Sequence, residues 1–159
     1  MARKTKVFTA QEERDEGKQF LITEMVAFKA ERWARRVLMG LSRSKAPPPE
    51  GVLEMGMAGL SYFGIRAFMS MDFDEAEPLM AEMMECVSVI PDPRNPTFSR
   101  PMDDEDIEEV LTIAQLRSEV LELHTGFSPA DWIRKLTSRS APITEENSSD
   151  TPMSPEPSE

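Results

Sequence analysis

Residues 108–127 (EEVLTIAQLRSEVLELHTGF) constrain the fold of this chain more than any other segment. Their composition is strongly helix-forming, acidic residues precede them, and Gly126 stands where such a helix would end. Apolar side chains occupy much of the circumference of this helix, so other parts of the chain or a partner must cover it. We therefore predict a helix over residues 104–125 that is covered on several sides.

The composition is that of one soluble domain with some disordered sequence: 159 residues, of which 40% are hydrophobic and 30% charged. A domain of about 140 residues buries roughly two thirds of its unfolded surface, enough for a core without metal or disulfides. The single cysteine, Cys86, cannot form an intramolecular disulfide, which is typical of a reducing cytoplasm. No apolar stretch approaches the ~18 residues that span a bilayer, and no apolar signal core follows the basic N-terminus. We expect a cytoplasmic protein without a membrane partner.

Charge is unevenly distributed along the chain, whose net charge is −11. Residues 1–45 hold 11 Lys and Arg against 6 Asp and Glu, residues 46–140 hold 7 against 18, and residues 141–159 hold 0 against 5. This acidic balance argues against nucleic-acid binding, which needs clustered cations. The asymmetry either steers a polar partner or pairs the two halves of one domain, and we favour the pairing.

Two patterns in the first part of the chain predict local structure. Residues 6–10 and 19–24 are strand-like and are expected to pair antiparallel, with Phe20 and Ile22 on one face. Residues 26–41 then change to helical spacing, with one apolar stripe along the helix. Another face of this helix is basic and is more typical of a solvated surface than of a site for an acidic partner. That face consists of Lys29, Arg32 and Arg36.

The middle of the chain predicts further helices and a second strand pair. The expected elements are a Pro-rich connector at 43–51, helices at 53–70 and 72–85, a strand at 86–90 and its return strand at 97–100. Glycine inside a helix costs about 1 kcal/mol relative to alanine. We therefore expect Gly56 and Gly59 to permit close approach of a neighbouring helix.

Residues 138–159 are rich in Ser, Pro and Glu and have almost no large apolar side chains, so we expect a disordered acidic C-terminal tail. A short terminal helix at 129–136 is expected before it. The predicted organisation is one domain at 1–137 with an α+β, helix-dominated fold of about four helices and short β-hairpins.

Few residues are suited to chemistry. His124 is the only histidine, and no hydroxyl or thiol nucleophile is spaced to use it, so a hydrogen-bonded packing role is favoured. One Cys and one His cannot complete a tetrahedral metal site. The acidic run at 103–109 lacks the glycine and spacing of a calcium loop, and stabilisation of a helix N-terminus accounts for it. We expect no enzyme activity, no metal and no cofactor.

Seven of the 12 methionines lie between residues 55 and 84. Flexible thioether side chains fill irregular core gaps, and they also form adaptable binding surfaces. Core packing is favoured for any single methionine, while the cluster as a whole is equally consistent with a groove that accepts apolar segments of a partner. The candidate partner-binding residues are Met55, Met57, Met80, Met83, Met84 and Phe127.

Three blocks of sequence follow one another between residues 14 and 127. The first comprises 14–25 (RDEGKQFLITEM) and 30–34 (AERWA); the second 56–59 (GMAG), 75–79 (EAEPL), 85–87 (ECV) and 90–93 (IPDP); the third 106–110 (DIEEV), 116–120 (LRSEV) and 123–127 (LHTGF). In order and spacing, these blocks resemble a family of tailed-phage and prophage proteins called tail assembly chaperones.

The resemblance implies a protein that acts in the host bacterial cytoplasm while a long phage tail is assembled. Family members are thought to bind the extended, aggregation-prone tape-measure protein and to help bring tail-tube subunits to it. They are generally absent from the mature virion. The resemblance implies no catalytic residues, and it leaves a homo-oligomer open.

Two other functions remain as alternatives. A structural tail or tail-completion component would be present in mature virions, unlike a transient chaperone. An acidic inhibitor that mimics nucleic acid is suggested only by the net charge of −11. It ranks below the other two, because about half of the excess acid lies in the tail or at helix starts.

Overall fold

The computed structural model describes residues 2–45 and 64–126, and between them residues 47, 48, 51, 52, 54, 56, 57, 59 and 60. The predicted acidic tail and the short terminal helix lie outside these residues, as do parts of the predicted connector and of the helix at 53–70. These features stay predictions. None of the helices in the described part of the chain has the length and apolar character that a bilayer crossing requires.

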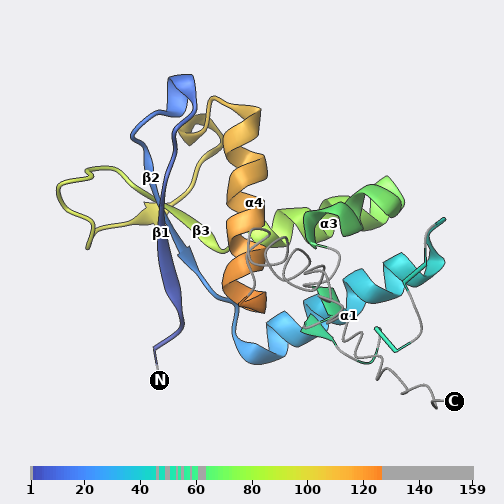
Figure 1. Ribbon diagram of the computed structural model, residues 1–159. Helices are drawn as coiled ribbons and strands as arrows, with labels where there is room; N and C mark the ends of the chain where they lie inside the picture. Colours follow the sequence, from blue (N-terminus) through green and yellow to red (C-terminus); the bar gives the residue numbers. More distant parts are fainter. Residues whose placement is uncertain are drawn as a thin grey trace, which may run out of the picture.

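One antiparallel sheet forms the β part of the fold (Figure 1). Its strands, in their order across the sheet, are β1 (Thr5–Thr9), β2 (Gln19–Thr23), β3 (Val87–Ile90) and β4 (Arg100–Pro101). The pair predicted at 6–10 and 19–24 is confirmed, and Phe20 and Ile22 are both fully buried. The two predicted strand pairs are not separate hairpins, because Phe20 pairs with Val89 and joins them in a single sheet.

Three α-helices have bounds among the described residues, against the four expected; Met57, Gly59 and Leu60 are also α-helical, in a segment that is only partly described. The three are α1 (Ala27–Arg43), α3 (Phe73–Met84) and α4 (Val110–Thr125); short 3₁₀ helices include η1 (Glu13–Asp15), η3 (Gly64–Ser70) and η4 (Asp104–Asp106). The helices predicted at 26–41 and 72–85 are confirmed by α1 and α3. The last part of the helix predicted at 53–70 is the 3₁₀ helix η3, a tighter winding with poorer hydrogen-bond geometry.

Gly56 does not permit close helix packing, contrary to the prediction. Its φ is +53°, a left-handed conformation that favours glycine, and a Cβ there would meet no atom of a described residue within 4 Å. A close approach occurs instead in α1, where a Cβ on Gly40 would overlap the methyl group of Met71. The sequence does not indicate this contact, because it joins segments that are far apart in the chain.

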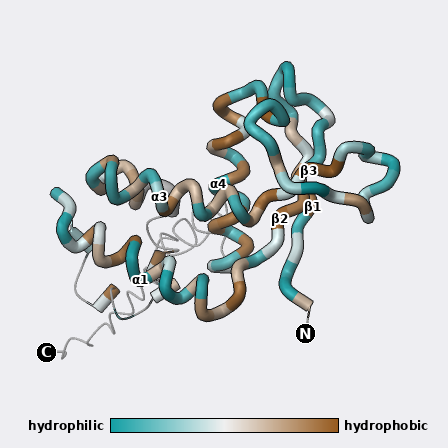
Figure 2. The backbone as a smooth tube through the Cα atoms, turned by 180° about the vertical axis from the view of Figure 1, so that it is seen from behind, coloured by the Kyte–Doolittle hydropathy of each residue, from teal (hydrophilic) through white to brown (hydrophobic). Residues whose placement is uncertain are grey.

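α4 lies between the sheet and the other helices (Figure 1). It contacts β1 and β2 on one side, and α3 and η3 on the other. After Leu111, every residue of α4 except Ala114 is at least partly buried, so the predicted covering of this helix is confirmed. Figure 2 shows hydrophobic and hydrophilic positions alternating along the helices, as expected for helices with a buried face. The core side chains form one cluster that includes Phe20, Trp33, Leu79 and Leu116.

The start of α4 differs from the prediction. The helix begins at Val110, and residues 104–106 form the separate 3₁₀ helix η4. Asp103 and Asp106 close η4 as a capping box, in which each side chain accepts a backbone N–H near the start of the turn. Residues 103–106 therefore do not begin α4, and only the end of the acidic run, at Glu109, reaches its start.

Asp15 of η1 holds the chain at the start of α4 instead. It is fully buried, and its two carboxylate oxygens accept hydrogen bonds of 2.9 Å from the N–H groups of Glu108 and Glu109. The Lys18 ammonium lies 2.8 Å from Asp15 Oδ1. Burial alone would raise the pKa of Asp15, but Lys18 and the two N–H groups outweigh it and hold the pKa well below its ordinary value. A distant loop thus supplies the negative charge that the sequence pattern assigns to residues 103–106.

Ion pairs join the basic first part of the chain to the acidic part that follows, as the favoured interpretation of the charge asymmetry predicts. They are Lys6–Glu119, Arg14–Glu109, Lys29–Glu85, Arg36–Glu82 and Arg43–Glu75. Arg36 donates two hydrogen bonds to Glu82, of 2.7 and 2.6 Å. Part of the basic face of α1 therefore lies against acids of α3 and is not simply a solvated surface.

Candidate partner-binding groove

Of the methionines predicted to bind a partner, one belongs to the core and three pack against it. Met83 is fully buried, on the same face of α3 as the buried Leu79. Met57, Met80 and Met84 are partly buried and pack against the core cluster. Met83 is therefore not on an exposed surface, because α3 turns this face toward the core. Partner contact by the other three stays a prediction. Met55 and Phe127 lie outside the described residues.

Exposed apolar side chains lie elsewhere. They occur at Val7, Val26, Phe28, Met39, Met69, Phe73, Phe98, Val110 and Leu111. Single exposed apolar residues are common on protein surfaces and need no special role. Val7 and Leu111 are more informative, because Val7 belongs to a strand that forms one wall of a groove, and Leu111 lines the opposite wall.

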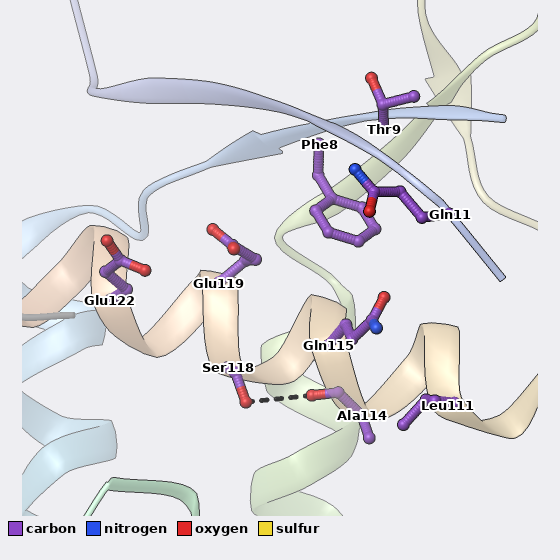
Figure 3. Close-up of a pocket in the computed structure, with 9 residues that line it drawn as sticks. All are labelled: Phe8, Thr9, Gln11, Leu111, Ala114, Gln115, Ser118, Glu119 and Glu122. Atoms are coloured by element: carbon purple, nitrogen blue, oxygen red, sulfur yellow. Dashed lines mark hydrogen bonds between the residues drawn. The ribbon is translucent and has the colours of Figure 1, made fainter. Parts of the chain in front are cut away.

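The groove runs between β1 and α4 (Figure 3). Its volume is 490 Å³, within the roughly 300–1,000 Å³ range of ligand pockets. It is lined by Phe8, Thr9 and Gln11 from β1 and the segment after it, and by Leu111, Ala114, Gln115, Ser118, Glu119 and Glu122 from α4. The α4 residues recur at helical spacing, so they share one face of the helix. Figure 3 shows the Phe8 ring directed toward α4, and Gln115 and Glu119 directed toward the strand.

β1 is an edge strand, and its outer side carries backbone groups that β2 does not bond. The Ala10 N–H donates to the Lys18 carbonyl at 2.9 Å, and the Glu24 N–H donates to the Lys4 carbonyl at 3.0 Å. Because hydrogen bonding alternates along an antiparallel pair, every second residue between these points directs its N–H and C=O away from β2. These outward residues are Thr5, Val7 and Thr9. No described residue hydrogen-bonds their backbone groups.

The opposite edge of the sheet is less open to another strand. β4 has two residues, and one of them is Pro101, which has no N–H to donate. Short edge strands and prolines both discourage strand addition. β1 has five residues and no proline. Within the part of the chain that the structure describes, β1 is therefore the edge that is able to accept another strand.

Acidic side chains determine the charge at one end of the groove. Lys6 of β1 forms an ion pair with Glu119, and its Nζ lies 3.6 Å from Glu122 Oε2. The hydrogen bond to Glu119 raises the pKa of Lys6, so the ammonium stays protonated. Two carboxylates thus face one ammonium, which leaves one negative charge in excess. The far end of the groove is apolar, with Leu111 and Ala114.

His124 and Cys86 both have structural roles. His124 Nε2 accepts a hydrogen bond from the Met25 N–H at 2.7 Å, and Nδ1 lies 2.7 Å from the Val120 carbonyl oxygen, to which it donates. The predicted packing role of His124 is confirmed. Burial raises the pKa of the Cys86 thiol to about 11, so it is protonated and weakly nucleophilic at neutral pH. Among the described residues, no cluster of three or more His, Cys, Asp and Glu side chains could hold a metal ion.

None of the groove residues is among the six named residues that the sequence predicts to bind a partner. The strand-like composition of residues 6–10 and the helical spacing of the groove residues in 111–122 are both visible in the sequence. That β1 lies at a sheet edge beside α4 is not, because it depends on the pairing of distant strands. No protein-family model, curated protein or solved structure matches the chain. The groove is therefore interpreted from its own geometry and charge.

Proposed function

We propose that this protein is a non-enzymatic tail assembly chaperone of a tailed phage or prophage, which binds the tape-measure protein and helps recruit tail-tube subunits. The observation that carries the proposal is the order and spacing of the three sequence blocks between residues 14 and 127. Their described parts fall on β2 and α1, on α3 and β3, and on α4, so they cover the elements that build the core.

The candidate site favours binding of a polypeptide over chemistry. An open strand edge beside a groove is a common way to bind an extended segment of another protein. His124 and Cys86, the residues best suited to acid–base or nucleophilic chemistry, are instead held in structural contacts or buried. These observations support a binding protein.

In this mechanism the chaperone covers aggregation-prone segments of the tape-measure protein until tail-tube subunits replace it. The net charge of −11 keeps the complex soluble. The protein acts in the host cytoplasm and is absent from the finished virion. Because several acids are paired with cations of the same domain, the nucleic-acid mimic gains no support.

Co-expression with the tape-measure protein of the same phage tests this function. We expect a soluble complex that co-purifies and that dissociates when tail-tube protein is added. An unrelated acidic protein of similar size and charge is the control for solubilisation by charge alone. An insoluble tape-measure protein with no association would contradict the proposal. A stoichiometric band in purified virions would identify a structural tail component instead.

A further inference from the structure

We propose that the groove between β1 and α4 binds an extended segment of the partner as an added β-strand, and that this segment carries an apolar side chain followed four residues later by Lys or Arg. The identity of the partner, the tape-measure protein, rests on the proposed function. The mode of binding rests on the edge of β1, the lining of the groove and its charge.

The edge of β1 supplies the hydrogen bonds for the added strand. Thr5, Val7 and Thr9 direct their N–H and C=O groups away from β2, and Val7 is 47% exposed. A strand antiparallel to β1 would bond these groups at three alternate positions. Its side chains would then alternate between the outer face of the sheet and the groove above α4.

The lining of α4 determines which side chains fit. β1 and α4 run in opposite directions, because Lys6 lies beside Glu119 and Glu122, whereas Glu12 accepts a hydrogen bond of 2.7 Å from Gln115. An antiparallel added strand therefore runs with α4, from the apolar end of the groove to its acidic end.

The length of the groove sets the spacing of the two specific side chains. At about 1.5 Å per helical residue, Leu111 and Glu122 are roughly 16 Å apart along α4. Four residues of a strand span about 13 Å. A segment with its apolar residue over Leu111 and Ala114 therefore places the fourth following residue near Glu119 and Glu122. Both of these side chains face the groove, because residues four apart in a strand lie on the same side.

Charge favours a basic partner segment over two other occupants. Among the described cations, Lys6 alone pairs with Glu119 and Glu122, so a second cation at this end would be neutralised. Residues 141–159 of this chain hold 5 acids and no Lys or Arg, and like charge would repel them. A second copy paired through β1 would bring two acidic faces of α4 together on one side of the joined sheet, at a net charge of −11 per chain.

The probe is the blocked peptide acetyl-Thr-Leu-Thr-Ala-Thr-Lys-Thr-amide, in which Leu, Ala and Lys would face α4. With the full-length ¹⁵N-labelled protein, we expect amide shifts centred on residues 5–9 and 111–122, with a Kd on the order of 1 mM or tighter. N-methylation of the third and fifth residues, whose amides would face β1, should abolish binding. N-methylation of the Ala, whose amide would face away, should leave affinity within about twofold. Replacing the Lys with Glu should weaken binding at least about fivefold.

Variants of the protein, tested with the unaltered peptide, probe the same site. Val7→Pro removes an N–H that does not bond β2, so the sheet keeps its own hydrogen bonds; Val7→Thr keeps the N–H and is the control. Val7→Pro should weaken peptide binding about tenfold, and Val7→Thr should leave it within about twofold. Glu122→Gln should weaken it about threefold, as expected for a partly exposed charge pair, whereas Glu105→Gln on the exposed η4 should not.

Several results would overturn the inference. Equal binding of the two N-methylated peptides, or shifts confined to other parts of the surface, would contradict strand addition even if Val7→Pro fails to fold. Concentration-dependent self-association that Val7→Pro abolishes would assign the edge to a second copy. Shifts of residues 127–159 in Val7→Pro without peptide would assign it to the chain itself.

Co-purification of the tape-measure protein with the Val7 variants tests this inference separately from the proposed function. If it co-purifies equally with Val7→Pro and Val7→Thr, the groove is not its binding site and the chaperone function stands. If it binds neither variant nor the unaltered protein, while the peptide still occupies the groove, the chaperone function fails and the strand-binding groove stands.

Discussion

The Asp15 carboxylate joins the loop between β1 and β2 to the chain that begins α4, through the N–H groups of Glu108 and Glu109 and the ammonium of Lys18. Its pKa is depressed in the folded state, so the charge stabilises the fold above the ordinary pKa of about 4, and this stability is lost as the pH falls below that value. We expect Asp15→Asn to cost about 3 kcal/mol at neutral pH, because an amide cannot accept both N–H groups. The difference in the free energy of unfolding between Asp15→Asn and the unaltered protein should become smaller as the pH falls from about 5 to about 2. Urea unfolding of the two proteins, at neutral pH and across this acidic range, measures the loss of free energy and its dependence on pH.

Asp104→Asn is the matched control for this prediction. Asp104 is exposed, and its side chain makes no hydrogen bond or ion pair with another described residue. Its substitution should change the free energy of unfolding by no more than about 0.5 kcal/mol. A loss in Asp15→Asn that does not vary with pH would mean that the buried charge is not the source of the stability.

At the scale of elements, α4 is held at both ends by the chain around β2. Asp15 bonds the residues just before its first turn, and His124 in its last turn accepts the Met25 N–H. We expect His124→Phe, which keeps a ring in place, to cost about 1–2 kcal/mol by leaving that N–H unpaired. The two anchors are roughly 24 Å apart along the helix, so the losses in Asp15→Asn and His124→Phe should add within about 0.5 kcal/mol in a double-mutant cycle. A coupling well above 1 kcal/mol would show that the two ends of α4 dock as one unit.

Across the whole molecule, the sequence predicts what depends on neighbours and misses what depends on distant contacts. The strand-like composition around Phe20 and Ile22 and the apolar stripe of α1 are local patterns, and both predictions are confirmed. Two contacts join segments that share no sequence pattern. Phe20 pairs with Val89, and the Glu108 N–H donates a hydrogen bond to Asp15. The groove was missed for the same reason, because it lies between β1 and α4, which are far apart in the sequence. A methionine suits both a core and a surface, so only the packing of α3 places Met83 inside.

Charge pairing between the two parts of the chain leads to a prediction at this same scale. The bidentate contact from Arg36 lowers the pKa of Glu82, which ties α1 to α3 electrostatically. Arg36→Glu should destabilise the fold by about 1–2 kcal/mol, because it replaces attraction with repulsion, and adding Glu82→Arg should restore most of the loss. Lys45→Glu makes the same change in net charge on an exposed residue and should cost no more than about 0.5 kcal/mol. If urea unfolding shows equal losses for Arg36→Glu and Lys45→Glu, the pairing does not stabilise the domain, and the charge asymmetry is left to steer a partner.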